Sequence, residues 1–164
     1  MDVRYINPFI AALSRYLRTV AGLRARRRTP FVNEGFHAAG HFHAVIRFAG
    51  DVEGAVVLSV PPPVAARLHE ARAGEPAPPE DPRVSRTVEE IATLLAGGAK
   101  QEIDRMGIPF RIGVPSLLVG AEPEDAPGRE GLSLVVPFDL EGEELWLQVL
   151  NAFPAGAPAQ GPRG

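Results

Sequence analysis

Hydrophobic residues recur at intervals of three and four positions in two long segments of the chain. The first segment runs from about Asn7 to about Gly22, and its apolar face consists of Phe9, Ala12, Leu13, Tyr16, Leu17 and Val20. The second runs from about Pro82 to Met106, and its apolar stripe consists of Val84, Val88, Ile91, Leu95, Ala99, Ile103 and Met106. This spacing follows the 3.6-residue period of an amphipathic helix. The pattern predicts two long helices that each bury one face.

Apolar runs between and after these helices predict strands over residues 31–37, 41–48, 55–60, 132–138 and 145–153. The segment "IPFRIGVPSLLVG", residues 108–120, adds extended structure that Pro115 interrupts. A short helix is expected over residues 61–72, where prolines precede an alanine-rich run. The acidic, proline-rich segments 73–82 and 121–130 are expected to be loops.

The two halves of the sequence follow the same order of features. In each half a helix leads to a Pro-Phe pair and then to a hairpin, whose turn contains "DVEG" in the first half and "DLEG" in the second. A shift of 79 residues carries Pro30 onto Pro109. We therefore expect an α/β (α+β) fold of two pseudo-repeated halves, in which a mixed or antiparallel sheet of about six strands packs against the two long helices.

The composition fits one globular domain. The chain has 164 residues, of which 45% are hydrophobic, and this is enough for one stable hydrophobic core but too little for two. We expect a single domain over residues 1–153. The remaining segment, 154–164, consists mainly of proline, glycine and alanine and is predicted to be disordered.

Charge and cysteine content narrow the range of partners and chemistries. The net charge of -3, with an isoelectric point near 5.8, gives no global attraction to nucleic acid or to an acidic membrane. The absence of cysteine excludes disulfides, thiolate metal sites and cysteine nucleophiles, and it fits a cytoplasmic protein. Arg15 and Arg18 interrupt the apolar N-terminal segment, which therefore resembles neither a signal peptide nor a membrane span.

The outward side of the second long helix carries polar residues and one glycine. These positions are Arg86, Glu90, Thr93, Gly97, Lys100 and Asp104. Gly97 and Gly98 each cost about 0.5 to 1 kcal/mol relative to alanine inside a helix. For Gly98, close packing of the helix on the sheet would compensate, whereas the outward Gly97 would leave room for the backbone of a partner. The alternative is a glycine- and alanine-rich sequence that tolerates a weak helix position.

The sequence "EIATLLAGGAK", residues 90–100, followed by "PFRIGVPSLLVG", resembles the active helix and next strands of the CheX branch of the CheC, CheX and FliY phosphatases of bacterial chemotaxis. In this family the helix carries Glu-x-x-Asn and then a small residue or glycine, and a proline-containing strand ends in glycine. The resemblance extends more weakly through "MDVRYINPFI" and "GAVVLSV" and covers most of the chain from Met1 to Phe153. CheC proteins carry the motif in both helices and CheX proteins only in the second, which agrees with Ala11 and Ser14 in the first helix here.

The resemblance implies a CheX-like protein that binds a CheY-type receiver domain in chemotaxis or two-component signalling. Glu90 would pair with the lysine that receiver domains place beside their phosphorylated aspartate. The partner-binding positions would be Arg86, Glu90, Gly97 and Lys100, and the catalytic pair Glu90 and Thr93. The resemblance also implies a homodimer and no cofactor of the chain's own, because Mg²⁺ would be carried by the receiver.

Thr93 stands where the family has the asparagine that orients the attacking water. A carboxamide accepts and donates hydrogen bonds at once, whereas the threonine side chain is shorter, branched and without a separate donor and acceptor. Two outcomes are open: a weak aspartyl-phosphate phosphatase, or a binding module that has kept the fold and lost the chemistry. A third is a dimerisation or scaffold domain without receiver binding, in which Glu90 is a solvated residue that pairs with Arg86.

Two other groups of residues offer different chemistry. His41 and His43 share one face of an expected strand and could bind a divalent metal, but two histidines alone are not a site, and we expect none. Because Arg47 continues that face, we expect a polar surface or a dimer edge there. The basic run "RARRR", residues 24–28, is expected to be a solvated helix end, where cations suit the helix dipole.

Overall fold

The computed structural model describes residues 3–120 and 131–154, and for Val3 and residues 151–154 it describes only the backbone. The loop expected over 121–130 and all but the first residue of the tail expected over 154–164 lie outside the described residues. The two long helices predicted from periodicity and the short helix between them are confirmed. They are α1 (Val3–Arg15), continued by the π-helical segment η1 (Tyr16–Val20), α2 (Pro62–Ala73) and α3 (Pro82–Arg105).

The first helix begins at Val3, before the expected start near Asn7. The reason is that Tyr5 and Ile6, both buried, extend its apolar face by one turn towards the N-terminus. At its other end the helix widens into η1, where the Ala21 backbone N–H donates to the Tyr16 carbonyl oxygen at 3.0 Å. Such π-helical turns are rare and occur frequently at functional sites.

The strands form one sheet, and every strand pair among the described residues is antiparallel. The bounds are β1 (Ala25–Arg27), β2 (Phe31–Glu34), β3 (Phe42–Gly50), β4 (Val52–Val60), β5 (Phe110–Ile112), β6 (Ser116–Val119), β7 (Leu132–Leu140) and β8 (Glu143–Pro154). The sheet has eight strands, where about six were expected, because Pro115 divides one extended segment into β5 and β6, and because β1 was missed.

The strand β1 corrects the interpretation of the basic run as a helix end. Ala25 and Arg27 lie opposite Leu140 and Phe138 of β7, so the backbone of this run completes an edge of the sheet. The exposed Arg26 and Arg27 side chains suit an edge strand, which charged residues protect from pairing with another chain.

The order of the strands shows the two pseudo-repeated halves. Along the sheet the order is β1, β7, β8, β4, β3 and β5, while β2 also pairs with β7 and β6 also pairs with β3. The short strands of each half therefore lie against the first long strand of the other half, and β4 and β8 join the halves in the middle. This arrangement confirms the repeat that the sequence indicated.

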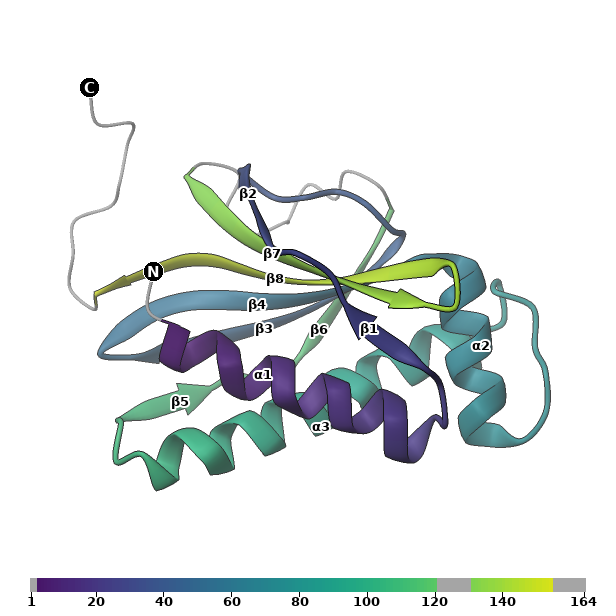
Figure 1. Cartoon of the computed structure of the whole chain (residues 1–164), viewed down its shortest axis with the longest axis horizontal. Coiled ribbons are helices and arrows are strands. Elements are labelled where there is room, and N and C mark those ends of the chain that lie inside the picture. The colour runs from purple at the N-terminus through teal and green to yellow at the C-terminus, as the bar shows by residue number, and fades with distance from the viewer. Residues whose placement is uncertain (1–2, 121–130, 155–164) are drawn as a thin grey trace.

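Both long helices cover the same face of the sheet, as Figure 1 shows, and α2 lies at one end of it beside the start of α3. The large core beneath them includes Phe9 and Leu13 of α1, Ile91 and Leu95 of α3, and Leu58 of the sheet, all buried. A Cβ on Gly98 would lie 3.4 Å from the Ala12 Cβ and 3.5 Å from an Arg15 guanidinium nitrogen. Gly98 thus packs against α1, and the expectation that it packs on the sheet was wrong.

The other face of the sheet carries a smaller apolar cluster and a buried polar network. The cluster consists of Val45, Ala55, Val57 and Leu150. In the network the His43 Nε2 donates to the Gly120 carbonyl oxygen at 3.0 Å, and because a carbonyl only accepts, Nδ1 accepts from the Ser59 hydroxyl at 2.8 Å. Gln148 donates to the Ser59 hydroxyl oxygen at 3.3 Å.

This network corrects the expected role of the two histidines. His43 is buried and both of its ring nitrogens are engaged, so it has none free for a metal. His41 precedes β3 and is partly exposed. The face that was expected to be polar is mostly buried, because Val45 lies on it beside His43 and only Arg47 is fully exposed. No helix in the described residues is both long enough and apolar enough to cross a membrane.

Candidate functional site

The helix α3 positions the candidate residues on its outward side. Its start is fixed by Asp81, whose carboxylate accepts a hydrogen bond from the Arg83 backbone N–H at 2.9 Å, and by Pro82 in the first turn. The structure places the predicted residues on one ridge along α3, which consists of Arg86, Glu90, Thr93, Gly97, Lys100 and Asp104. Of these, Glu90 and Lys100 are half-buried and the other four are exposed. The ridge therefore faces outward from the core.

Glu90 pairs with an arginine of another helix. The guanidinium of Arg72, near the end of α2, forms an ion pair with the Glu90 Oε2, and the two side chains are 46% and 36% exposed. The contact is a charge pair, because no hydrogen bond to that oxygen accompanies it within the described residues. Arg86, the local partner expected for Glu90, is exposed and has no ion pair among the described residues.

The hydroxyl of Thr93 is engaged by its own helix. It donates to the Glu89 carbonyl oxygen at 3.1 Å. Since a hydroxyl has a single proton, Thr93 has only oxygen lone pairs left for another group. The side chain is exposed, so a water molecule could donate to it, but Thr93 would have no proton to give in this conformation.

Gly97 leaves an open notch on the ridge. A Cβ built at this position would have no atom within 4 Å, so neither sterics nor backbone conformation requires glycine here. Gly97 lies seven residues after Glu90, which places it about 10 Å further along the helix. Lys100, the next position on the ridge, pairs with Asp104 one turn away at 2.5 Å.

Three residues near the ridge were missed by sequence reasoning. Leu94 is 56% exposed and lies one turn from both Glu90 and Gly97, and its sequence signal is a leucine outside the apolar stripe. Arg72 pairs with Glu90, and the charges of both act on Tyr16, through tertiary packing for which the sequence pattern offers no signal. The Tyr16 hydroxyl is buried and has no hydrogen-bond partner within the described residues.

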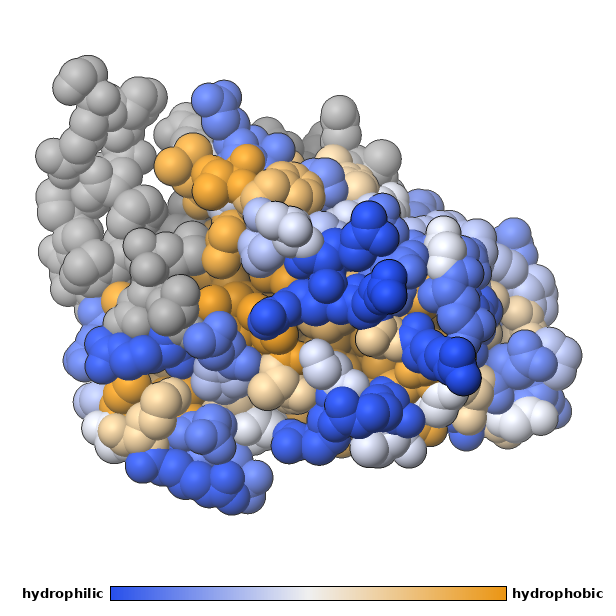
Figure 2. Space-filling view, viewed as in Figure 1, coloured by the Kyte–Doolittle hydropathy of each residue, from blue (hydrophilic) through white to orange (hydrophobic). Residues whose placement is uncertain are grey.

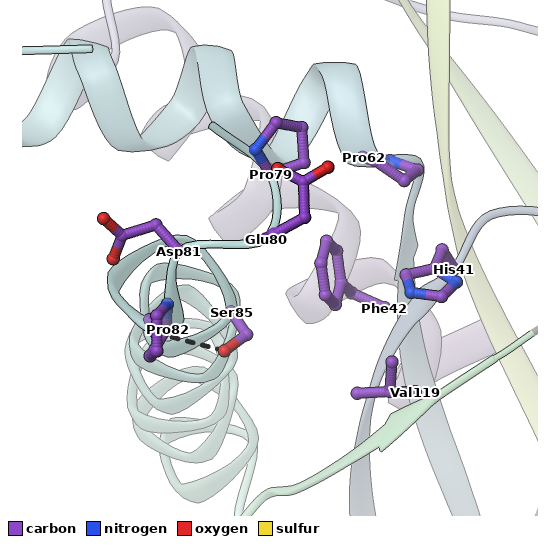
Figure 3. Close-up of a pocket in the computed structure, with 9 residues that line it drawn as sticks. All are labelled: His41, Phe42, Pro62, Pro79, Glu80, Asp81, Pro82, Ser85 and Val119. Atoms are coloured by element: carbon purple, nitrogen blue, oxygen red, sulfur yellow. Dashed lines mark hydrogen bonds between the residues drawn. The ribbon is translucent and has the colours of Figure 1, made fainter. Parts of the chain in front are cut away.

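A pocket of about 370 Å³ lies at the N-terminal end of α3, away from this ridge, and Figure 3 shows its lining. The lining residues are His41, Phe42, Pro62, Pro79, Glu80, Asp81, Pro82, Ser85 and Val119. Hydrogen bonds from Arg83 lower the pKa of Asp81 to about 2, and the Ser85 hydroxyl donates to the Pro82 carbonyl oxygen. These groups are already engaged, and the labelled polar side chains do not converge on one point.

A patch of exposed apolar side chains lies at the far end of the β2–β7 pair, where Figure 2 shows an orange area beside the blue hydrophilic surface. Its residues are Val32 and Leu132, which share one face of the sheet because Val32 lies opposite Leu134. They are remote from α3, so the patch does not belong to the ridge.

Comparisons with known proteins agree with the fold. The family model of chemotaxis phosphatase CheX matches residues 42–139, which is more than half of the chain. No curated protein matches. Among solved structures, a CheC-like superfamily protein from Shewanella sp. PV-4 superimposes with a TM-score of 0.81 at 23% identity, over 91% of this chain and 97% of that one.

Two further structures are similar. A chemotactic CheC-like protein from Shewanella oneidensis MR-1 gives a TM-score of 0.79 at 23% identity, over 92% of this chain and 99% of that one. The complex of CheX with CheY, BeF₃ and Mg²⁺ from Borrelia burgdorferi gives 0.72 at 20% identity, over 91% and 98%. These structural likenesses support the fold, and the family model decides the membership. The chain belongs to the CheX family of chemotaxis phosphatases.

Proposed function

We propose that this chain binds the receiver domain of a CheY-type response regulator through the outward ridge of α3. The observation that carries the proposal is that the Glu90 carboxylate and the side-chain-free notch at Gly97 lie on the same outward ridge. A CheX protein from Borrelia burgdorferi has been crystallised with CheY, BeF₃ and Mg²⁺, which supports the same class of partner here.

Several features of the ridge support a partner of this kind. A receiver domain carries a lysine beside its phosphorylated aspartate, and Glu90 can form a charge-assisted hydrogen bond with it. Gly97 admits the backbone of the partner without a steric clash, and the exposed Leu94 beside it offers an apolar contact. The cations Arg86 and Lys100 lie on the same ridge and suit an anionic phosphoryl group.

We further propose that the chain is mainly a binding module and hydrolyses the aspartyl phosphate slowly or not at all. Hydrolysis requires a water held in line with the phosphorus, which a carboxamide achieves by accepting from the water and donating to the phosphoryl group. The Thr93 hydroxyl already donates its only proton in a hydrogen bond to the Glu89 carbonyl oxygen. The Mg²⁺ of the reaction would belong to the receiver, and the proposal requires no metal in this chain.

A binding measurement tests the proposal. Each CheY-type receiver domain encoded in the source genome would be loaded with BeF₃⁻ and Mg²⁺ and titrated with the full chain. We expect saturable binding to one of them and a loss of about 100-fold or more in affinity for Glu90→Arg, because a buried or half-buried like-charge contact costs several kcal/mol. Ala11→Arg, at the matching position of the other long helix, is the control and should bind normally.

Failure of every receiver to bind, with and without BeF₃⁻, would contradict the proposal and favour a scaffold domain. The homodimer and the cytoplasmic location stay predictions. Light scattering of the purified chain would give its mass in solution, and fractionation of the source cells would give its location.

A further inference from the structure

Three helical segments bring polar side chains together behind the ridge of α3. Tyr16 comes from η1, Arg72 from α2 and Glu90 from α3. Burial raises the pKa of the Tyr16 hydroxyl, while the charge of Arg72 lowers it and that of Glu90 raises it, so both charges act on this buried group. The junction therefore links the predicted anchor Glu90 to a helix that is not part of the ridge.

Two side-chain contacts connect α2 to α3 one turn apart. In the buried one, His69 contacts Thr87 through Nδ1 and Oγ1 at 3.0 Å. Since the Thr87 hydroxyl donates to the Arg83 carbonyl oxygen at 3.0 Å, its oxygen accepts the hydrogen bond from the His69 Nδ1–H. The half-exposed contact is the ion pair of Arg72 with Glu90, three residues further along both helices. The first contact and the apolar packing of Leu68 fix α2, so Arg72 extends from a fixed support.

The ion pair involves the buried oxygen of the Glu90 carboxylate and leaves the other oxygen accessible. Arg72 contacts Oε2, which is buried, whereas the Glu90 side chain as a whole is 36% exposed. The exposed acceptor is therefore on the Oε1 side, where a partner could reach it. An arginine that blocked the anchor would cover the exposed oxygen, which is the opposite of the observed arrangement.

We propose that Arg72 is a positioning residue, which holds the Glu90 carboxylate in the orientation that a receiver domain binds. The inference rests on the proposed function and names a determinant of it outside α3. A free glutamate on a helix surface samples several rotamers and loses that freedom on binding, whereas a glutamate held by Arg72 has lost part of it in the free protein. The guanidinium also remains beside the carboxylate in the complex, so Glu90 keeps a second cation when it meets the lysine of the receiver.

The affinity of Arg72→Ala for the BeF₃⁻-loaded receiver tests this role. We expect binding about three- to tenfold weaker than for the unaltered chain, the range that corresponds to ordering one long side chain. Arg72→Lys should recover part of the loss, since it restores the charge but not the planar guanidinium. Arg105→Ala is a matched control, because it removes the same side chain from the far end of α3, where Arg105 pairs only with Glu102 among the described residues.

A double-mutant cycle separates positioning from a merely structural role. If Arg72 acts through Glu90, the pair Arg72→Ala and Glu90→Ala together should bind no more weakly than Glu90→Ala alone. Additive losses would overturn the proposal, and so would an Arg72→Ala variant that binds as well as or more tightly than the unaltered chain. Arg72→Gln provides a second variant if the alanine variant unfolds at lower temperature.

The test also distinguishes the two proposals. If the unaltered chain binds a receiver and Glu90→Arg does not, the proposed function holds, and the Arg72 variants decide the positioning role by themselves. If the unaltered chain binds no receiver in any state, the proposed function fails and the role of Arg72 fails with it.

Discussion

The helices α1 and α3 occupy corresponding places in the two halves of the molecule, yet their outward sides differ. The shift of 79 residues that aligns the halves carries Ala11, Ser14 and Arg18 onto Glu90, Thr93 and Gly97. The first helix thus has a methyl group in place of the carboxylate and a long cationic side chain in place of the notch. Both helices nevertheless bury an apolar face on the same side of the sheet.

This difference shows that the buried face and the outward side of each helix are specified by separate residues. The buried positions of α1 and α3 keep the apolar character that packing requires, so either helix supports the domain. The outward positions are free to change, and only those of α3 combine an acid, an exposed leucine and a glycine. The helix α2 adds to the asymmetry, because its Arg72 forms an ion pair with Glu90 of α3.

Truncation of a buried leucine in either long helix should cause the largest loss of stability, and the loss should be similar for the two helices. Leu13→Ala in α1 and Leu95→Ala in α3 remove buried side chains, so each should lower the free energy of unfolding by about 2 to 5 kcal/mol. Chemical denaturation measures the loss. A small effect in only one helix would break the comparison, because it would mean that the two helices do not share the structural role.

Replacing Thr93 with asparagine should restore the chemistry that distinguishes a phosphatase from a binding module. The amide can accept from water and donate to the phosphoryl group, so we expect phosphate release from a phosphorylated receiver to rise at least about tenfold. A phosphate-release assay with the receiver in excess measures the rate. Ser14→Asn, at the corresponding place in α1, is the matched variant, and an equal acceleration there would show that the ridge of α3 is not special.

Substitutions at the two adjacent glycines should affect the stability of the chain equally but receiver binding unequally. Gly97→Ala and Gly98→Ala should each raise the free energy of unfolding by about 0.5 to 1 kcal/mol, because alanine is the better helix former and neither Cβ meets an atom closer than 3.4 Å. Only Gly97→Ala should weaken receiver binding, by a few-fold, because it adds a methyl group to the ridge. Normal binding by Gly97→Ala would remove the notch from the proposal.

The buried network of His43, Ser59 and Gln148 should make the stability of the chain depend on pH. The core that the described residues form beneath the helices is mainly apolar, so this dependence would distinguish the two faces of the sheet. Burial lowers the pKa of His43, although its hydrogen bond to the Gly120 carbonyl oxygen raises it, and His41 and His37 lower it further. In acid the unfolded chain therefore binds a proton that the folded chain resists, so the free energy of unfolding should fall as pH drops below about 6.5.

Denaturation at neutral pH and at about pH 5 measures this effect, and His43→Gln should show a smaller fall. Burial also lowers the pKa of His37, so part of the dependence should remain in that variant. A fall of the same size in His43→Gln as in the unaltered chain would exclude His43 as a cause.

The sequence was sufficient for the helices, the hairpins and the repeat, because these depend on local periodicity and on turn residues. It failed for β1, since a run of four arginines and one alanine carries no strand signal and forms a strand only because β7 offers it an edge. The ridge was predictable from helical spacing alone. The Arg72 contact and the burial of His43 were not, because both depend on side chains that tertiary packing brings together from distant parts of the chain.

The strand order has a consequence for how the chain folds. Each half relies on the other to cover the outer edge of its first long strand, so an isolated half would expose open edges that invite aggregation. Phe31 of β2 pairs with Val135 of β7, which the ribosome adds about a hundred residues later. The β1 and β2 edge of the sheet can therefore form only after β7 has been synthesised, and pairings this distant in sequence make folding slow.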